Sequence, residues 1–200
     1  MKQLVIYVHG KGGSIEEAEH YRSLFPAFDV IGFDYKSQNP WHAKKEFSIF
    51  YDKVAKGYDS VILIANSIGA FFSMNGFEDK KITKAFFISP IVNMEKLIID
   101  MMNWSNITEE ELCNKKEIIT DFGETLSWEY LCYVRKHPIK WNIPTYILYG
   151  ENDNLTSKET ISKFSEQVCA AITIMKDGEH WFHTDSQMKF LDDWIIKLIR

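Results

Sequence analysis

The sequence has few cysteines, no surplus of basic residues and no apolar run of the length needed to cross a membrane. The three cysteines, an odd number without paired spacing, indicate reduced thiols in a cytoplasmic protein rather than a disulfide framework; they are Cys113, Cys132 and Cys169. Acidic residues outnumber basic ones by 28 to 23, which gives a net charge of −5. Without a Lys/Arg-rich run, nucleic acid is not expected as a partner, and no membrane span is expected.

What the chain does contain is the composition of an ordinary globular protein. Its 200 residues are 46% hydrophobic and 26% charged, which suits one domain with a sizeable core. The first apolar run, residues 4–8, is too short for the core of a signal peptide and is expected to form the first strand. We therefore predict a single domain spanning residues 1–200.

Short apolar runs alternate with amphipathic segments along most of the chain. The runs predict six strands, at residues 4–8, 30–33, 61–64, 85–88, 145–149 and 172–175. Helical spacing and capping residues predict helices at about 15–25, 40–57, from 69, after 156 and at 186–199, with Asn39 and Thr156 as the expected caps of the second and fourth. Strands that alternate with helices favour an α/β fold, in which a parallel sheet is covered on both faces through right-handed crossovers.

Residues 91–143 interrupt this alternation. They contain helix-like pieces at about 93–102, 108–119 and 127–136, the second of which opens with a capping box of Thr108 and Glu111. The segment is too short to hold its own core. We therefore predict that it is a helical lid inserted into the domain rather than a second domain.

The stretch Ala65-Asn66-Ser67-Ile68-Gly69 lies where a buried strand turns directly into a helix-compatible run. Small residues two before and two after Ser67 allow strand and helix to approach closely, which would hold the serine in a strained conformation with its hydroxyl exposed. The alternative is a buried serine at an ordinary strand end. This stretch resembles the nucleophile elbow of the α/β-hydrolase superfamily, Gly-x-Ser-x-Gly, with Ala65 in place of the first glycine. The resemblance is to small serine hydrolases and esterases with a minimal core, and it implies a three-layer α/β sandwich with a mainly parallel sheet of about six strands.

The same resemblance implies an acid and a base further along the chain, because a serine is a weak nucleophile without them. In this family they follow in the order Ser, Asp or Glu, then His. Asp153 comes three residues after Gly150, where a strand ends, and His180 follows the last strand. Ser67, Asp153 and His180 are therefore the predicted catalytic residues. Asp34 and Ser89, at other strand ends, are a rival acid and nucleophile outside the family's local patterns, and His183 is a nearby competitor of His180.

A metal site built from His180, His183 and Asp185 is conceivable from their spacing. No matching group of ligands occurs elsewhere, so no metal is expected.

The loop His9-Gly10-Lys11-Gly12-Gly13 follows the first strand. By resemblance, its Lys11 N–H and the N–H of Ile68 form the oxyanion hole, while His9 shapes the loop. Two nucleotide-binding alternatives fit less well, because Gly12 after Lys11 breaks a P-loop and Ile15 stands where a dinucleotide fingerprint needs its third glycine. No cofactor is expected.

A serine nucleophile argues against the haloalkane dehalogenases and epoxide hydrolases of similar fold, which use aspartate. Large side chains of the insertion would line an apolar acyl pocket or simply pack the lid; they are Met101, Met102, Trp104, Trp128, Tyr130, Tyr133 and Trp141. We predict a cytoplasmic, carboxylesterase-like serine hydrolase that cleaves a small or medium acyl ester through an acyl-enzyme intermediate. Amide, thioester or C–C hydrolysis, or a partner-binding protein that retains the triad, stay open, and the sequence does not indicate an oligomeric state.

Overall fold

The computed structural model describes residues 1–199, and the chain divides into two compact units. The first consists of Met1–Val92 and the chain from Lys140 onward, and the second is Asn93–Ile139. The predicted insertion, residues 91–143, thus nearly coincides with the second unit. Its action as a lid stays a prediction.

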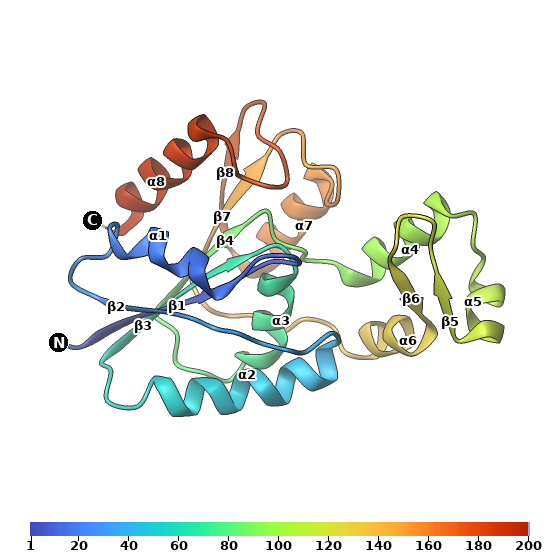
Figure 1. Cartoon of the computed structure of the whole chain (residues 1–200), viewed down its shortest axis with the longest axis horizontal. Coiled ribbons are helices and arrows are strands. Elements are labelled where there is room, and N and C mark those ends of the chain that lie inside the picture. Colours follow the sequence, from blue (N-terminus) through green and yellow to red (C-terminus); the bar gives the residue numbers. More distant parts are fainter. Residues whose placement is uncertain (200) are drawn as a thin grey trace. The chain divides into compact units, whose positions relative to one another are not determined.

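The first unit is built on a six-stranded sheet in which every neighbouring pair is parallel (Figure 1). Its order is β2-β1-β3-β4-β7-β8. The strands are β1 (Gln3–Val8), β2 (Asp29–Gly32), β3 (Ser60–Asn66), β4 (Lys84–Ile88), β7 (Thr145–Gly150) and β8 (Ala171–Met175). The six strands and the α/β fold predicted from the sequence are therefore confirmed.

The central strands are buried on both faces, as their continuous apolar runs require. Helices of the first unit cover the sheet (Figure 1): α1 (Ala18–Arg22), α2 (Pro40–Val54), α3 (Ile68–Gly76), α7 (Lys158–Val168) and α8 (Asp185–Ile199). Tyr21 of α1 and Trp194 of α8 belong to one buried cluster against one face. On the other face Phe47 of α2 contacts Phe72 of α3. Because parallel strands end at the same edge of a sheet, the loops after them meet there.

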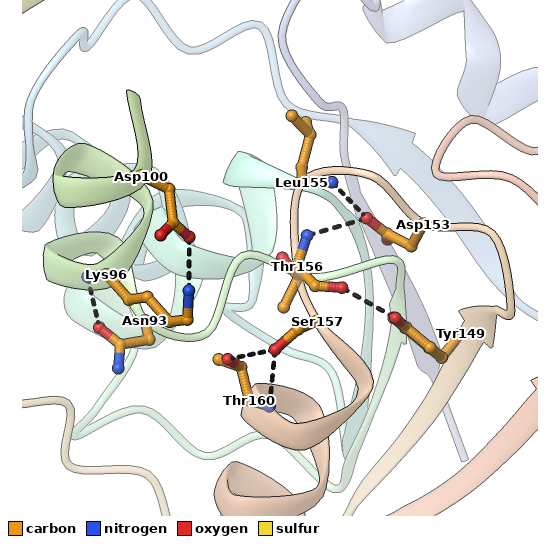
Figure 2. Close-up of polar contacts among 9 residues, drawn as sticks. All are labelled: Asn93, Lys96, Asp100, Tyr149, Asp153, Leu155, Thr156, Ser157 and Thr160. Atoms are coloured by element: carbon orange, nitrogen blue, oxygen red, sulfur yellow. Dashed lines mark hydrogen bonds and ion pairs between the residues drawn. The ribbon is translucent and has the colours of Figure 1, made fainter. Parts of the chain in front are cut away.

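Two helices of the first unit differ from the predictions in their bounds. The first helix is shorter than residues 15–25: a 3-10 turn, Ile15–Glu17, precedes α1, which ends at Arg22. Helix α7 is capped by Ser157 rather than Thr156, with the Ser157 hydroxyl accepting from the N–H of Thr160 (Figure 2). By contrast, Asn39 caps α2 as predicted.

The second unit contains three helices and a two-stranded hairpin. Its elements are α4 (Met94–Trp104), α5 (Glu109–Lys115), β5 (Glu117–Ile119), β6 (Thr125–Ser127) and α6 (Trp128–Lys136). Asn93 caps α4 (Figure 2). Thr108 caps α5, as predicted. The predicted helix 108–119 is wrong in its second half, because α5 ends at Lys115 and residues 117–119 pair with β6 instead.

Arg135 of α6 joins this unit's helices by pairing with Glu109 of α5 and Glu95 of α4. Its bidentate hydrogen bonds hold the pKa of Glu109 below its ordinary value. Within residues 1–199, no helix combines the length and apolar character that a transmembrane segment requires. The three cysteines are free thiols.

Candidate active site

Ser67 stands between β3 and α3 in a backbone conformation that few non-glycine residues adopt, with φ 49° and ψ −122°. Two backbone hydrogen bonds to the neighbouring β4 segment hold it there. The Ser67 N–H donates to the carbonyl of Ile88 at 3.0 Å, and the N–H of Ile91 donates to the carbonyl of Ser67 at 3.1 Å. The tight strand-to-helix turn expected from the sequence is therefore present.

Glycine at position 69 is required by close packing. A Cβ there would overlap the backbone carbonyl oxygens of Val8 and His9, so α3 could not lie this close to the end of β1. Gly10 is likewise close to the serine, because a Cβ built on it would lie 3.1 Å from the Cβ of Ser67. These two glycines bring the loop after β1 against the elbow.

The structure brings together Ser67, His180 and Asp153, which the sequence places far apart. The Nε2 of His180 lies 2.9 Å from the Ser67 hydroxyl oxygen, and its Nδ1 lies 2.7 Å from Asp153 Oδ2. With Nδ1–H donated to the carboxylate, Nε2 is left to accept the serine hydroxyl. The Asp153 side chain is fully buried, whereas the imidazole is 14% exposed.

Asp153 is fixed by its own loop. Its Oδ1 accepts the backbone N–H groups of Leu155 and Thr156, both at 2.9 Å (Figure 2), which leaves Oδ2 to His180. The carbonyl of Thr156 accepts the Tyr149 hydroxyl at 2.8 Å. Burial, and then the charge of Asp153, raise the pKa of Tyr149, so this hydroxyl stays a donor. The use of Thr156 in this loop explains why α7 begins one residue later than predicted.

Besides the Asp153–His180 hydrogen bond, the loops after β7 and β8 meet through a close backbone contact at Gly150. A Cβ on Gly150 would overlap the carbonyl oxygens of Gly178 and Glu179, and the N–H of Asn152 donates to the Gly178 carbonyl at 2.8 Å. The spacing between Asp153 and His180 therefore depends on this contact, which tolerates no side chain at position 150.

The loop after β1 has a fixed peptide orientation at its centre. The Gly10 carbonyl accepts the N–H of Gly13 at 3.2 Å and lies 2.8 Å from His9 Nδ1. In a planar trans peptide the following N–H, that of Lys11, points the opposite way from this carbonyl. The His9 ring is itself held by stacking on Tyr35, with centroids 4.5 Å apart. His9 thus shapes the loop, as the sequence led us to expect.

Ile68, the other expected donor, is the first residue of α3. A backbone N–H at this position has no acceptor within its own helix.

The rival residues have other surroundings. Ser89 is 1% exposed, and its hydroxyl has no hydrogen-bond partner within residues 1–199. His183 Nδ1 lies 2.7 Å from the carbonyl of Trp181, and Asp34 forms a 2.6 Å ion pair with Lys36 at the surface. Across residues 1–199, no group of three or more His, Cys, Asp or Glu side chains is arranged to hold a metal ion.

The sequence reasoning missed Tyr149 and Thr156, which support the acid loop. The available signal was a tyrosine at the apolar end of a strand that the sequence predicts to be buried, since a buried hydroxyl needs a partner. Of the large insertion side chains, Met102 and Trp141 are buried. Trp141 packs on Phe87 and donates its indole N–H to Thr145 within the first unit.

No family model matches this chain. A curated protein of Mycoplasma genitalium, "Putative esterase/lipase 3", is 27% identical over 103 residues. That match spans 45% of this chain and only 37% of the relative.

Solved structures are similar over nearly the whole chain. Est1E from Butyrivibrio proteoclasticus is 14% identical, covers 99% of this chain and 87% of its own, and superposes with a TM-score of 0.74. Mouse alpha/beta hydrolase domain-containing protein 10 is 16% identical over 98% of this chain and 89% of its own, with a TM-score of 0.77. A soluble variant of monoglyceride lipase from Saccharomyces cerevisiae is 12% identical over 99% and 86%, with a TM-score of 0.68. The chain therefore has the α/β-hydrolase fold, which confirms at the level of the fold the resemblance noted at Ser67.

Proposed function

We propose that this protein is a serine hydrolase that cleaves a small or medium acyl ester through an acyl-enzyme intermediate. One observation carries the proposal: the continuous pair of hydrogen bonds from the Ser67 hydroxyl to His180, at 2.9 Å, and from His180 to Asp153, at 2.7 Å. A buried carboxylate, an oriented imidazole and a strained, partly exposed serine form a nucleophile with its base and acid.

In acylation, the Ser67 oxygen attacks the ester carbonyl while His180 Nε2 takes the hydroxyl proton. Asp153 stabilises the resulting imidazolium, which then gives its proton to the departing alcohol. In deacylation, His180 removes a proton from water, the hydroxide attacks the acyl carbon, and the proton returns to Ser67 as the acid leaves.

Each step forms a negatively charged oxygen that needs fixed donors. We assign these donors to the backbone N–H groups of Lys11 and Ile68. The orientation of the Gly10 carbonyl supports the first, and the first position of α3 supports the second.

An ester is the favoured substrate because the partial relative is named an esterase or lipase and a monoglyceride lipase shares the fold. The substrate partner is thus a small acyl compound. The preference for a short or medium acyl group rests on the sequence-based expectation that aromatic side chains of the insertion line an acyl pocket. A cytoplasmic location is also part of it, supported by the three free thiols.

The test is labelling by a fluorophosphonate, followed by turnover of p-nitrophenyl esters with acyl chains from acetyl to palmitoyl. We expect labelling at Ser67 and a maximum of kcat/KM at a short or medium chain. Faster cleavage of matched amides or thioesters would replace the ester assignment. Absence of both labelling and turnover in the folded protein would favour the alternative of a partner-binding protein that retains the triad.

A further inference from the structure

A chain of polar side chains runs from the residue before Ser67, through a buried tyrosine, to an exposed glutamate near the loop after β1. It links Asn66, the residue before the serine, to Tyr7 on the neighbouring strand β1, and Tyr7 to Glu17. None of these three residues takes part in the proposed chemistry. Their contacts nevertheless join the two parts of the site that must be held in register.

Tyr7 is the centre of this chain. The side chain is 0% exposed, and its hydroxyl accepts the Nδ2–H of Asn66 at 2.9 Å while donating to Glu17. Burial raises the pKa of Tyr7, and its hydrogen bond to Glu17 adds to the effect, so the hydroxyl stays protonated. Both roles of the hydroxyl, donor and acceptor, are thus used.

Glu17 extends the chain to the loop that carries Lys11. Its Oε1 accepts the N–H of Ser14 at 3.3 Å. The same oxygen lies against Gly13, where a Cβ would be only 2.8 Å from it. The carboxylate therefore supports the end of the loop whose other end contacts Ser67 through Gly10.

Asn66 extends the chain to the elbow. Its Nδ2–H donates to Tyr7, whereas its Oδ1 is buried and has no hydrogen-bond partner within residues 1–199. Removal of the Tyr7 hydroxyl would leave both ends of this half-buried amide without a protein hydrogen-bond partner. Because a lost hydrogen bond is costly, the amide side chain would reorient. Asn66 directly precedes Ser67, so this change would reach the elbow.

We propose that Tyr7 is a positioning residue that holds the Lys11 N–H in register with Ser67, acting through Glu17 on the loop and through Asn66 on the elbow. This inference rests on the proposed function. It predicts that loss of the Tyr7 hydroxyl weakens stabilisation of the negatively charged oxygen and leaves ground-state substrate binding unchanged.

The decisive comparison is Tyr7→Phe against Tyr21→Phe. Tyr21 is also buried, at 3% exposure, and its ring centroid is 5.0 Å from that of Tyr7. Its hydroxyl lies outside the chain of hydrogen bonds, so its removal controls for the loss of a hydroxyl from the same packed pair. We expect Tyr7→Phe to lower kcat by about 10-fold to 100-fold with KM unchanged, since a misplaced donor costs this much. Tyr21→Phe should keep the wild-type kcat.

A graded variant, Glu17→Gln, replaces two acceptor oxygens by one. It can satisfy the Tyr7 hydroxyl or the Ser14 N–H, but not both, so its kcat should fall between wild type and Tyr7→Phe.

Two further readouts distinguish positioning from general destabilisation. The first is the rate ratio between an ester and its thiono analogue, whose carbonyl sulfur accepts hydrogen bonds poorly. This ratio should fall in Tyr7→Phe, because the donors then contribute less. The second is amide hydrogen exchange of residues 11–14, which should become faster in Tyr7→Phe and not in Tyr21→Phe.

The outcomes separate this inference from the proposed function. Unchanged exchange of residues 11–14 in Tyr7→Phe overturns the inference, whether or not the wild-type protein is active. A lower kcat with an unchanged ester-to-thionoester ratio also overturns it. An inactive wild type overturns the proposed function, and faster exchange in Tyr7→Phe would then still establish the coupling of Tyr7 to the loop.

Discussion

Two adjacent strands of the sheet are each followed by a serine with a positive φ angle, and the two serines have different surroundings. Ser67 after β3 has φ 49°, and Ser89 after β4 has φ 42°. Asn66 and Ile88, the residues before them, are register partners. The hydroxyl of Ser67 meets an imidazole, whereas that of Ser89 is buried and has no hydrogen-bond partner within residues 1–199.

The comparison shows that backbone strain at a serine and the chemical surroundings of its hydroxyl are separate properties. A positive φ places a residue in a sparsely populated region, but it does not activate a hydroxyl. What Ser67 has in addition is a helix that begins at the next residue, an imidazole within hydrogen-bond distance and a carboxylate behind that imidazole. Pro90, which has no N–H to offer as an oxyanion donor, follows Ser89.

The largest difference in turnover is expected between the variants that lack the Ser67 hydroxyl and the Ser89 hydroxyl. Ser67→Ala should lower kcat by roughly 10⁶, by analogy with a serine protease, and should abolish fluorophosphonate labelling. Ser89→Ala should label and turn over like wild type. Peptide mapping of the labelled protein checks this comparison. Labelling of Ser89 in the Ser67→Ala variant would contradict the assignment of the nucleophile.

The two histidines of the last loop should differ almost as strongly. His180→Ala should lower kcat by roughly 10⁴ to 10⁶, because Ser67 loses its base. His183→Ala should have a mild effect, since the His183 ring lies against Trp181 and bonds its carbonyl. Steady-state turnover of one activated ester measures both. An inactive His183→Ala that remains folded would show that the base has been misassigned.

The acid comes next. Asp153→Asn should lower kcat by roughly 10⁴ with the fold intact, because an amide cannot orient and stabilise the imidazolium as a carboxylate does. Asp34→Asn is the matched control, because that carboxylate pairs with Lys36 at the surface. Circular dichroism verifies folding. Equal losses in the two variants would argue against the assignment of Asp153.

The loop donor should have a smaller effect. Lys11→Pro removes the backbone N–H and should lower kcat by roughly 10² or more, whereas Lys11→Ala retains it and should keep most of the turnover. The same activated ester serves for both. If Lys11→Ala is as inactive as Lys11→Pro while both stay folded, the lysine charge acts directly, and an anionic substrate group becomes the better assignment.

The smallest effect concerns stability. Ser89→Ala removes a buried hydroxyl that lacks a partner, and the free energy of unfolding should rise by about 1 kcal/mol. For a chain of this size, the corresponding rise in Tm is about 2–4 °C. Differential scanning calorimetry measures it. A lower Tm would mean that the Ser89 hydroxyl contributes a hydrogen bond in solution.

The sheet and the three expected triad residues could be predicted because their signals are local. Runs such as Val61 to Ile64 fit a strand buried on both faces, and each polar residue of the set follows such a run. The order Ser, Asp, His then identifies which strand ends matter. The distances between these three residues depend on the strand order and on the parallel direction of the strands, which puts the carboxyl ends of β3, β7 and β8 at the same edge of the sheet.

The predictions from the sequence failed where a contact with a distant residue determines the local conformation. Residues 117–119 continue the helical pattern of α5, but they pair with β6 across a turn in which Gly123 has φ 85°. The sequence around Thr156 suits a helix cap, but the backbone of Thr156 is hydrogen-bonded to Tyr149 and Asp153 instead. From the sequence, Tyr7 is a core residue of the first strand, and its hydrogen bonds with Asn66 and Glu17 are seen only in the structure.

The contact of Gly150 with Gly178 and Glu179 has a consequence for laboratory evolution of this scaffold. Because only main-chain atoms meet there, no compensating side-chain change can accommodate a larger residue at position 150. Gly69, packed against the carbonyls of Val8 and His9, is constrained in the same way. Libraries that randomise these two positions would consist almost entirely of inactive clones. Mutagenesis aimed at new substrates should hold both glycines constant and vary the side chains around them.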